Sequence, residues 1–347
     1  MLLVYLSSGL FLGWSLGAND AANIFGTAVG TKMVRFKTAA IICGIFVTIG
    51  AVVGGSGTTH TLGKLGAINA IAGAFMVATA AGFTVFWMTK LKMPVSSSQA
   101  IVGAIIGWNL FTGSPTDYDS LKKIVSTWIF CPILAAVFSI VLYSVVRFVM
   151  NRMSLHLLAV DKYTRIGLII VGAFGAYSLG ANNIANVMGV FVSVAPFKDI
   201  QVANLFILTG TQQLFFLGGV SIAIGAYTYS RRVMETVGGN LLKLSPETAL
   251  IVVLAQALVL FVFSSQGLEQ WLISNGLPAF PLVPVSSSQA VVGAVIGVGI
   301  IRGIRGIKYH TLGGIAIGWV TTPIVAGIIT FVSLFFLQNV FSQQVSQ

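Results

Sequence analysis

The chain has 347 residues, of which 56% are hydrophobic and only 8% are charged. An average soluble domain carries about 25% charged residues, and a surface this apolar would aggregate in water, which excludes an ordinary soluble protein. The net charge of +11 does not indicate nucleic-acid binding, because the basic residues fall in short gaps between apolar stretches and form no long tail.

Ten apolar stretches follow one another, most of them long enough for the roughly 20 residues that a membrane helix needs. They are residues 2–30, 38–56, 66–88, 94–111, 124–146, 166–195, 200–228, 248–264, 284–301 and 311–337. If the N-terminus lies outside and each stretch crosses once, 15 of the 19 basic residues fall in inside gaps. The positive-inside rule then predicts an all-α, multi-pass protein of the plasma membrane with both termini outside.

Two motifs occur twice in the same order. GANDAAN at residues 17–23 returns as GANNIAN at 180–186, and PVSSSQA at 94–100 returns unchanged at 284–290. A third matched feature is a tryptophan four residues before a proline: Trp128 with Pro132, and Trp319 with Pro323. The chain is therefore an internal duplication.

The two repeats are predicted at residues 1–160 and 161–347, with five apolar stretches in each. An odd number of crossings makes the second repeat start on the opposite side of the membrane. Inverted repeats with broken or re-entrant helices are the architecture of secondary transporters, which bind their cargo near the midplane. A channel is the less favoured alternative, since a pore does not need two pseudo-equivalent halves.

Asp20 is the one acidic residue that falls well inside an apolar stretch. An ionised carboxylate there is costly unless it is paired, and no Lys or Arg shares its depth, so a cation from solution is the natural partner. Carboxylate and amide oxygens suit sodium better than a transition metal. The predicted sodium ligands are Asp20, Asn19 and Asn23, and in the second copy Asn182, Asn183 and Asn186. A protonated Asp20 packed in the bundle is the alternative, and it would still permit proton coupling.

The PVSSSQ stretches predict an anion site. Proline and three serines disfavour a helix interior, so we expect unwound backbone that leads into short helices at residues 100–111 and 290–301. About twelve helical residues span roughly 18 Å, less than the roughly 30 Å hydrocarbon core, so their N-termini would lie deep in the protein. Free N–H groups, hydroxyls and amides there could hold an oxyanion. The donors would come from Ser96, Ser97, Ser98, Gln99, Ser286, Ser287, Ser288 and Gln289. Ordinary hydrogen bonding between helices is the alternative for these serines.

Together these motifs resemble the inorganic phosphate transporter family of sodium- or proton-coupled permeases, over essentially the whole chain. The resemblance implies inverted repeats, a transport domain beside a scaffold domain, and a homodimer that carries inorganic phosphate with sodium. It makes Asp20, Asn23, Asn183 and Asn186 ion or phosphate ligands. Asn183 departs from the family, where many members have a second Asp, and this leaves the number of coupling ions open.

Two rival functions stay open within transport: a proton-coupled permease for sulfate or a metal–phosphate complex, and an anion channel. Sulfate and phosphate have the same size and shape, so the sequence separates them poorly. No nucleophile–base pair, nucleotide-binding loop or dinucleotide fingerprint occurs in the chain. We therefore predict no catalytic residues, no enzyme activity and no cofactor.

Overall fold

The computed structural model describes residues 2–91, 95–152, 156–202, 206–231, 233–234, 244–303 and 309–346. Pro94 and five of the basic residues that we assigned to inside gaps lie outside this part of the chain. Those five are Lys92, Arg232, Lys243, Arg305 and Lys308.

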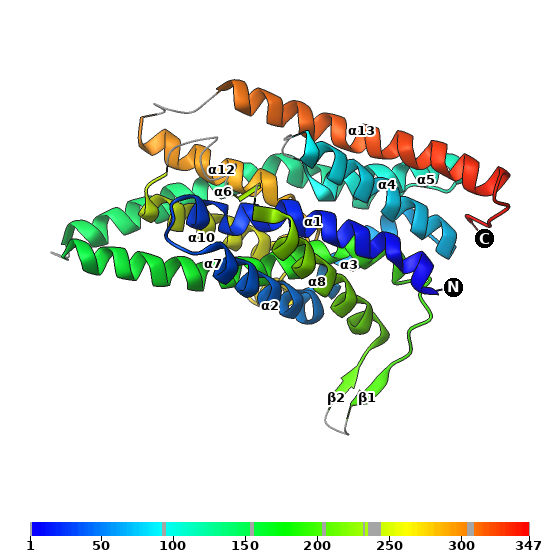
Figure 1. The fold of residues 1–347 in the computed structure, drawn as a ribbon, viewed down its shortest axis with the longest axis horizontal. Coiled ribbons are helices and arrows are strands. Elements are labelled where there is room, and N and C mark those ends of the chain that lie inside the picture. The colour runs from blue at the N-terminus through cyan, green and yellow to red at the C-terminus, as the bar shows by residue number, and fades with distance from the viewer. Residues whose placement is uncertain are drawn as a thin grey trace.

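Helices make up almost all of the regular structure (Figure 1). The first half contains α1 (Leu2–Gly30), α2 (Phe36–Gly54), α3 (Ser56–Gly66), α4 (Ile71–Lys90), α5 (Ser97–Thr112) and α6 (Tyr118–Arg152). The second half contains α7 (Leu157–Met188), the 3₁₀ turn η1 (Gly189–Phe191), α8 (Gly210–Thr228), α10 (Pro246–Val262), α11 (Gln266–Ser274), α12 (Ser287–Ile301) and α13 (Tyr309–Asn339). Each of the ten predicted stretches contains one helix, and the all-α membrane fold is confirmed.

Within the described residues, six helices are long and apolar enough to cross a membrane: α1, α2, α4, α6, α7 and α13. Helices α10 and α11, which meet at an angle of 69°, would make a seventh crossing as a bent pair. α5 and α12 are shorter, with 16 and 15 residues. At 1.5 Å per residue each spans about 24 Å or less, so neither crosses the hydrocarbon core on its own.

Several parts of the chain differ from the prediction, among them α11, which lies in the predicted gap between residues 264 and 284. Residues 200–202 and 206–208, expected at the start of a membrane helix, instead form two antiparallel strands, β1 (Ile200–Val202) and β2 (Phe206–Leu208), which project from the bundle (Figure 1). β-Branched residues in this short run favour strands. The capping box of Thr209 and Gln212 then fixes the start of α8. The helix α3 occupies a predicted gap, because its polar sequence gave no apolar signal.

The two halves of the sequence interlock. α1 packs against α8 and α2 against α7, while α5 packs against α13 and α12 against α6. Each pair joins one half to the other, and the first Gly of each GAN motif lies at such a contact. A Cβ on Gly17 would clash with the carbonyl of Ile222, and one on Gly180 with the carbonyl of Val47. The first glycine of each copy therefore lets its helix touch the backbone of a helix from the other half. The polar residues that follow in the motif are held between the halves.

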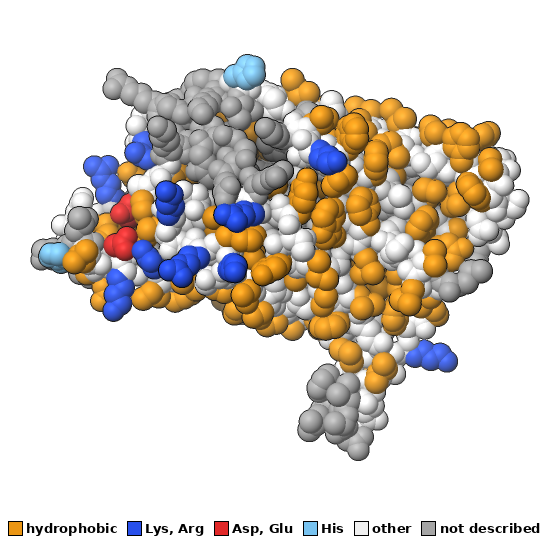
Figure 2. All heavy atoms as spheres, viewed as in Figure 1, with side chains coloured by type: hydrophobic (Ala, Val, Ile, Leu, Met, Phe, Trp, Pro, Cys, Tyr) orange, Lys and Arg blue, Asp and Glu red, His pale blue; other side chains and the backbone are white. Residues whose placement is uncertain are grey.

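The two termini lie at the same end of the molecule (Figure 1). The Tyr5 hydroxyl donates to Gln343 Oε1 at 3.0 Å, and the Trp108 indole donates to the carbonyl of Val345 at 3.0 Å. On the face drawn in Figure 2, the Lys and Arg side chains gather mostly at the opposite end, and apolar side chains cover the middle. That distribution accords with the predicted sidedness, which stays a prediction.

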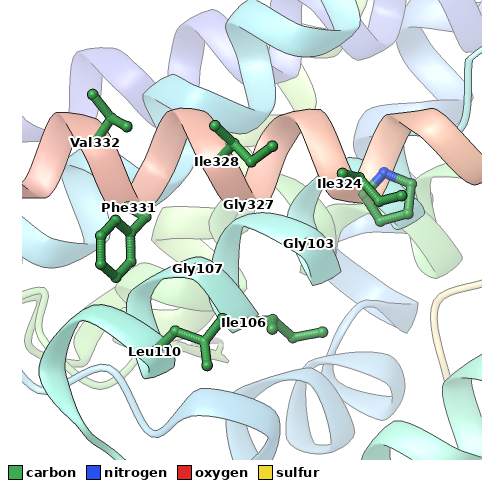
Figure 3. Close-up of a pocket in the computed structure, with 10 residues that line it drawn as sticks. Gly103, Ile106, Gly107, Leu110, Ile324, Gly327, Ile328, Phe331 and Val332 are labelled. Atoms are coloured by element: carbon green, nitrogen blue, oxygen red, sulfur yellow. The ribbon is translucent and has the colours of Figure 1, made fainter.

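The outer surface of the bundle is apolar, as a membrane requires. Ile129 and Phe130 on α6 are 64% and 61% exposed, and Val320 on α13 is 65% exposed. Between α5 and α13 this surface is hollowed into a groove of about 400 Å³, part of which Figure 3 draws. Aliphatic side chains, a phenylalanine and glycines line the groove, and none of the predicted site residues does. The groove is therefore separate from the predicted site.

Candidate functional site

All fourteen predicted site residues are buried, and none is more than 6% exposed. They come from four elements: α1 and α7 carry the GAN motifs, and α5 and α12 begin in the serine triplets. Asp20 is the only charged residue buried in the described part of the chain. The structure thus brings the two kinds of motif together in a polar cluster inside an apolar bundle.

The two oxygens of Asp20 each accept a hydrogen bond. Asn19 Nδ2 donates to Oδ1 at 2.7 Å, and the Ser97 hydroxyl donates to Oδ2 at 2.8 Å. Ser97 is the first residue of α5, so the carboxylate is joined directly to the start of a short helix. The predicted cation residue and the predicted anion residues of the first half are therefore neighbours.

Asn182 anchors the extended segment that precedes α12. Its Oδ1 accepts the N–H of Val285 at 2.8 Å, and its Nδ2 donates to the carbonyl of Val283 at 3.2 Å. The equivalent Asn19 also reaches the residue before its own serine triplet, donating to the carbonyl of Val95 at 3.3 Å. In both copies, this asparagine holds the chain just before the short helix.

Contacts also cross between the halves. Asn23 Nδ2 donates to the Ser287 hydroxyl at 3.1 Å, and Asn186 Nδ2 donates to the Ser98 hydroxyl at 2.9 Å. The Ser98 hydroxyl in turn donates to the carbonyl of Val285 at 3.0 Å. The two serine triplets therefore meet at one place, each beside the GAN motif of the opposite half.

The second copy differs from the first at Asn183. Its Oδ1 accepts a hydrogen bond from Asn186 Nδ2 at 2.9 Å. In the first copy, the oxygens of Asp20 accept instead from Asn19 and Ser97. Asn183 Nδ2 and Asn186 Oδ1 are buried and have no hydrogen-bond partner. The second copy is thus a neutral amide pair with one spare donor and one spare acceptor.

The short helices begin earlier than predicted. Ser96 and Ser286 are N-caps, whose hydroxyls accept the N–H of Gln99 at 3.2 Å and of Gln289 at 3.3 Å. The second and third serines already lie in the first helical turn, so they are not unwound. Serine is a strong N-cap, and a cap followed by two small polar residues is compatible with a helix start. The first N–H groups of both helices still have no partner within their helix.

This arrangement suits an oxyanion and a cation held side by side. Two helix N-termini supply free N–H groups and positive helix-dipole ends, and Asn183 Nδ2 adds a buried donor. Asp20 supplies the negative charge for a cation. The carbonyl oxygens of Gln99 and Gln289 are buried without partners, so both glutamines have unused hydrogen-bonding capacity at this site.

Three residues with buried polar atoms near these elements were not among the predicted site residues. Gln256 on α10 is fully buried, and neither its amide nitrogen nor its oxygen has a partner. The indole N–H groups of Trp128 and Trp319 are likewise buried without partners. A lone glutamine in an apolar stretch, and the duplicated Trp and Pro spacing, were the sequence signals available for them.

Comparisons with known proteins agree with the sequence resemblance. The "Phosphate transporter family" matches residues 16–330 and 273–347. A relative from Methanocaldococcus jannaschii, named "Putative phosphate permease", is 28% identical over 93% of both chains. The "Sulfate permease CysP" of Bacillus subtilis is 28% identical over 99% of this chain and 90% of its own. A solved structure entitled "The sodium-dependent phosphate transporter" has the same fold, with a TM-score of 0.77 and 21% identity over 97% of this chain and 98% of its own.

Proposed function

Because this chain belongs to the phosphate transporter family, we propose that it is a symporter that carries inorganic phosphate inward with a cation, sodium being the first choice, by alternating access. Its family and relatives are transporters and permeases, not enzymes. The proposal concerns which cation drives transport, which residues bind the cargo, and how the site opens to each side.

The observation that carries the proposal is the hydrogen bond from Ser97 to Asp20. A cation bound at Asp20 would lie next to the N-terminus of α5, where the oxyanion is expected. Each ion would then lower the electrostatic cost of burying the other, which makes their binding mutually dependent. Coupled binding of this kind is what a symporter needs.

The predicted sodium ligands divide into three groups on the basis of their contacts. We keep Asp20, Asn19 and Asn23 as the ligands of the cation. Asn182 already uses its Oδ1 on Val285, so we assign it to positioning the segment before α12. Asn183 and Asn186 bond to each other, and we assign their spare donor and acceptor to the anion.

Alternating access is proposed from the way in which the halves interlock. Each short helix packs against a long helix of the opposite half: α5 packs against α13, and α12 packs against α6. The site between them could open to one side or the other as these pairs move. Inverted repeats and outside termini, which the sequence predicts from its duplication and its basic residues, and a homodimer, which the family resemblance implies, are further parts of the proposal.

Sulfate is the second candidate cargo, because a relative that matches nearly the whole chain is named a sulfate permease. The buried side-chain carbonyl oxygen of Asn186 favours phosphate instead. It is an acceptor without a donor, and a protonated phosphate can supply an O–H group that sulfate lacks at neutral pH.

The deciding experiment is uptake of labelled phosphate into proteoliposomes, with sodium and proton gradients imposed separately. We expect concentrative uptake that follows the sodium gradient and is poorly inhibited by sulfate. Uptake driven only by the proton gradient would change the coupling ion. Passive uptake that ignores both gradients would favour a channel, and stronger uptake of labelled sulfate would identify sulfate as the cargo.

A further inference from the structure

Four hydrogen-bonding groups recur in matched positions of the two halves. The indole Nε1 of Trp128 and of Trp319 is a buried donor without a partner, and the Oε1 of Gln99 and of Gln289 is a buried acceptor without a partner. A buried polar group without a hydrogen-bond partner destabilises the folded protein. The same pattern in both repeats makes an accidental packing defect a poor explanation.

The packing of α5 against α13 fixes which of these groups are neighbours. A Cβ on Gly103 would clash with Pro323, and one on Gly107 would clash with Gly327. A step of four residues on one helix thus matches a step of four on the other, so the two helices run in parallel and in register. Figure 3 shows these glycines on the facing sides of the two helices.

One helical turn further back, the same register leads us to expect Gln99 and Trp319 at the same level of the α5–α13 contact. Gln99 is four residues before Gly103, and Trp319 is four residues before Pro323. Residues four apart lie on the same face of a helix. We call the contact between α5 and α13, and the matching contact between α12 and α6, a seam. The acceptor on α5 and the donor on α13 are therefore expected to face the same seam.

The other half repeats this geometry. A Cβ on Gly293 would clash with Pro132, and one on Gly297 with Ala136. One turn back along both helices, Gln289 on α12 and Trp128 on α6 occupy the matching places. Each serine triplet is thus followed by a glutamine. We expect its free side-chain carbonyl to lie at the same height along the helix pair as a free indole N–H.

We propose that Trp128 and Trp319 are positioning residues for the anion site, each donating its indole N–H to the carbonyl of the adjacent glutamine when the anion is bound. An indole is a donor only, so it can pair with the carbonyl of the glutamine but not with its NH₂. A glutamine held in this way presents its NH₂ to the site as a donor. The proposal rests on the proposed function, because it assumes that an oxyanion binds at the serine triplets.

The test is a double-mutant cycle on phosphate uptake by proteoliposomes. Trp319→Phe keeps the ring and removes the N–H, and we expect it to raise the KM for phosphate about two- to tenfold with little change in maximal rate. Trp319→Phe combined with Gln99→Leu should be no worse than Gln99→Leu alone, since the pair acts as a unit. Trp128→Phe with Gln289→Leu should behave in the same way.

The duplication supplies a matched control. Trp319→Phe combined with Gln289→Leu joins residues of different seams, and its effects on KM should multiply. Trp108→Phe is a second control, because the Trp108 N–H already donates to Val345, so this change should lower thermal stability and leave the KM unchanged. An unchanged KM in both Trp319→Phe and Trp128→Phe, or same-seam cycles that multiply, would overturn the proposal.

Equilibrium binding separates this proposal from the proposed function. Phosphate and sulfate binding to the purified protein in detergent needs no ion gradient, and the same variants can be measured there. Protein that binds an anion but gives multiplicative same-seam cycles contradicts only the role of the tryptophans. Protein that binds neither anion contradicts the proposed function and this proposal together.

Discussion

Asp20 on α1 is the one acidic residue that is buried in the described part of the chain, and the hydrogen bond from Ser97, the first residue of α5, joins it to the predicted anion residues. Its counterpart Asn183 is neutral and already paired with Asn186. The two copies of the motif therefore differ in chemistry at this position, where the first has a carboxyl group and the second has a neutral amide. At the scale of single residues, this difference decides where a cation can be held.

Asp20→Asn is expected to abolish sodium-dependent phosphate uptake, because the change removes the charge that attracts the cation while keeping the side-chain shape. Asp161→Asn is the matched control. Asp161 is exposed and forms only a surface pair with Arg165 at 3.4 Å, so its loss should leave uptake intact. Proteoliposome uptake with and without a sodium gradient measures both variants, and unchanged uptake by Asp20→Asn would remove Asp20 from the coupling role.

Ser97→Ala and Ser287→Ala are expected to raise the KM for phosphate about two- to tenfold each, in proportion to one lost hydrogen bond. Ser97 links α5 to Asp20, and Ser287 links α12 to Asn23. The control is Ser144→Ala, since the Ser144 hydroxyl bonds only to its own helix at Ile140. Initial rates across a range of phosphate concentrations give the KM, and an anion site elsewhere is indicated if both values stay at the wild-type level.

At the scale of the elements, close helix packing positions the site. α5 and α12 are too short to cross the membrane, so each depends on a long helix of the other half for support. The support is backbone contact at Gly103 against Pro323 and at Gly293 against Pro132. Small residues permit this approach, which drives helix association in membranes.

Gly103→Ala and Gly293→Ala are each expected to destabilise the protein by about 1–3 kcal/mol, because the added methyl group meets backbone that cannot move aside. Gly313→Ala provides the control on α13, where an added Cβ would meet nothing within 4 Å. Thermal unfolding in detergent compares the three variants. Equal melting temperatures for all three would show that the short helices do not depend on these contacts.

At the scale of the whole molecule, two interlocked repeats with a single charged site predict one coupling cation for each anion. With the voltage held at zero and about a tenfold sodium gradient, net uptake should stop at about a tenfold phosphate gradient. The free energy released by one cation that moves down its gradient then equals the free energy needed to move one phosphate up its gradient. Asn183→Asp replaces the amide donor that we assign to the anion by a carboxylate, so it should raise the KM for phosphate without raising this limit. Asn183→Ser, which stays neutral, should keep the wild-type limit; a wild-type limit near the hundredfold value would mean that two cations bind.

The sequence alone predicted the membrane class, the ten helical stretches, the duplication and the family. These follow from local features: hydrophobic length, charge placement and identical motifs can be seen without a fold. It also singled out Asp20 and the serine triplets, because polar residues at membrane depth are costly and conspicuous. It missed the strands at residues 200–202 and 206–208, the helix α3 and the start of each short helix at its second serine, because capping and turn geometry override a weak apolar signal.

Only the tertiary structure decided which motif meets which. Ser97 bonds to Asp20 of its own half, whereas Ser287 bonds to Asn23 of the other, and no sequence spacing distinguishes these pairings. The contacts of Gly103 with Pro323 and of Gly293 with Pro132 likewise depend on the register of helices far apart in the chain. Composition and local pattern fix what each segment can form, but hydrogen-bond partners at the site are set by packing between segments, which local pattern does not encode.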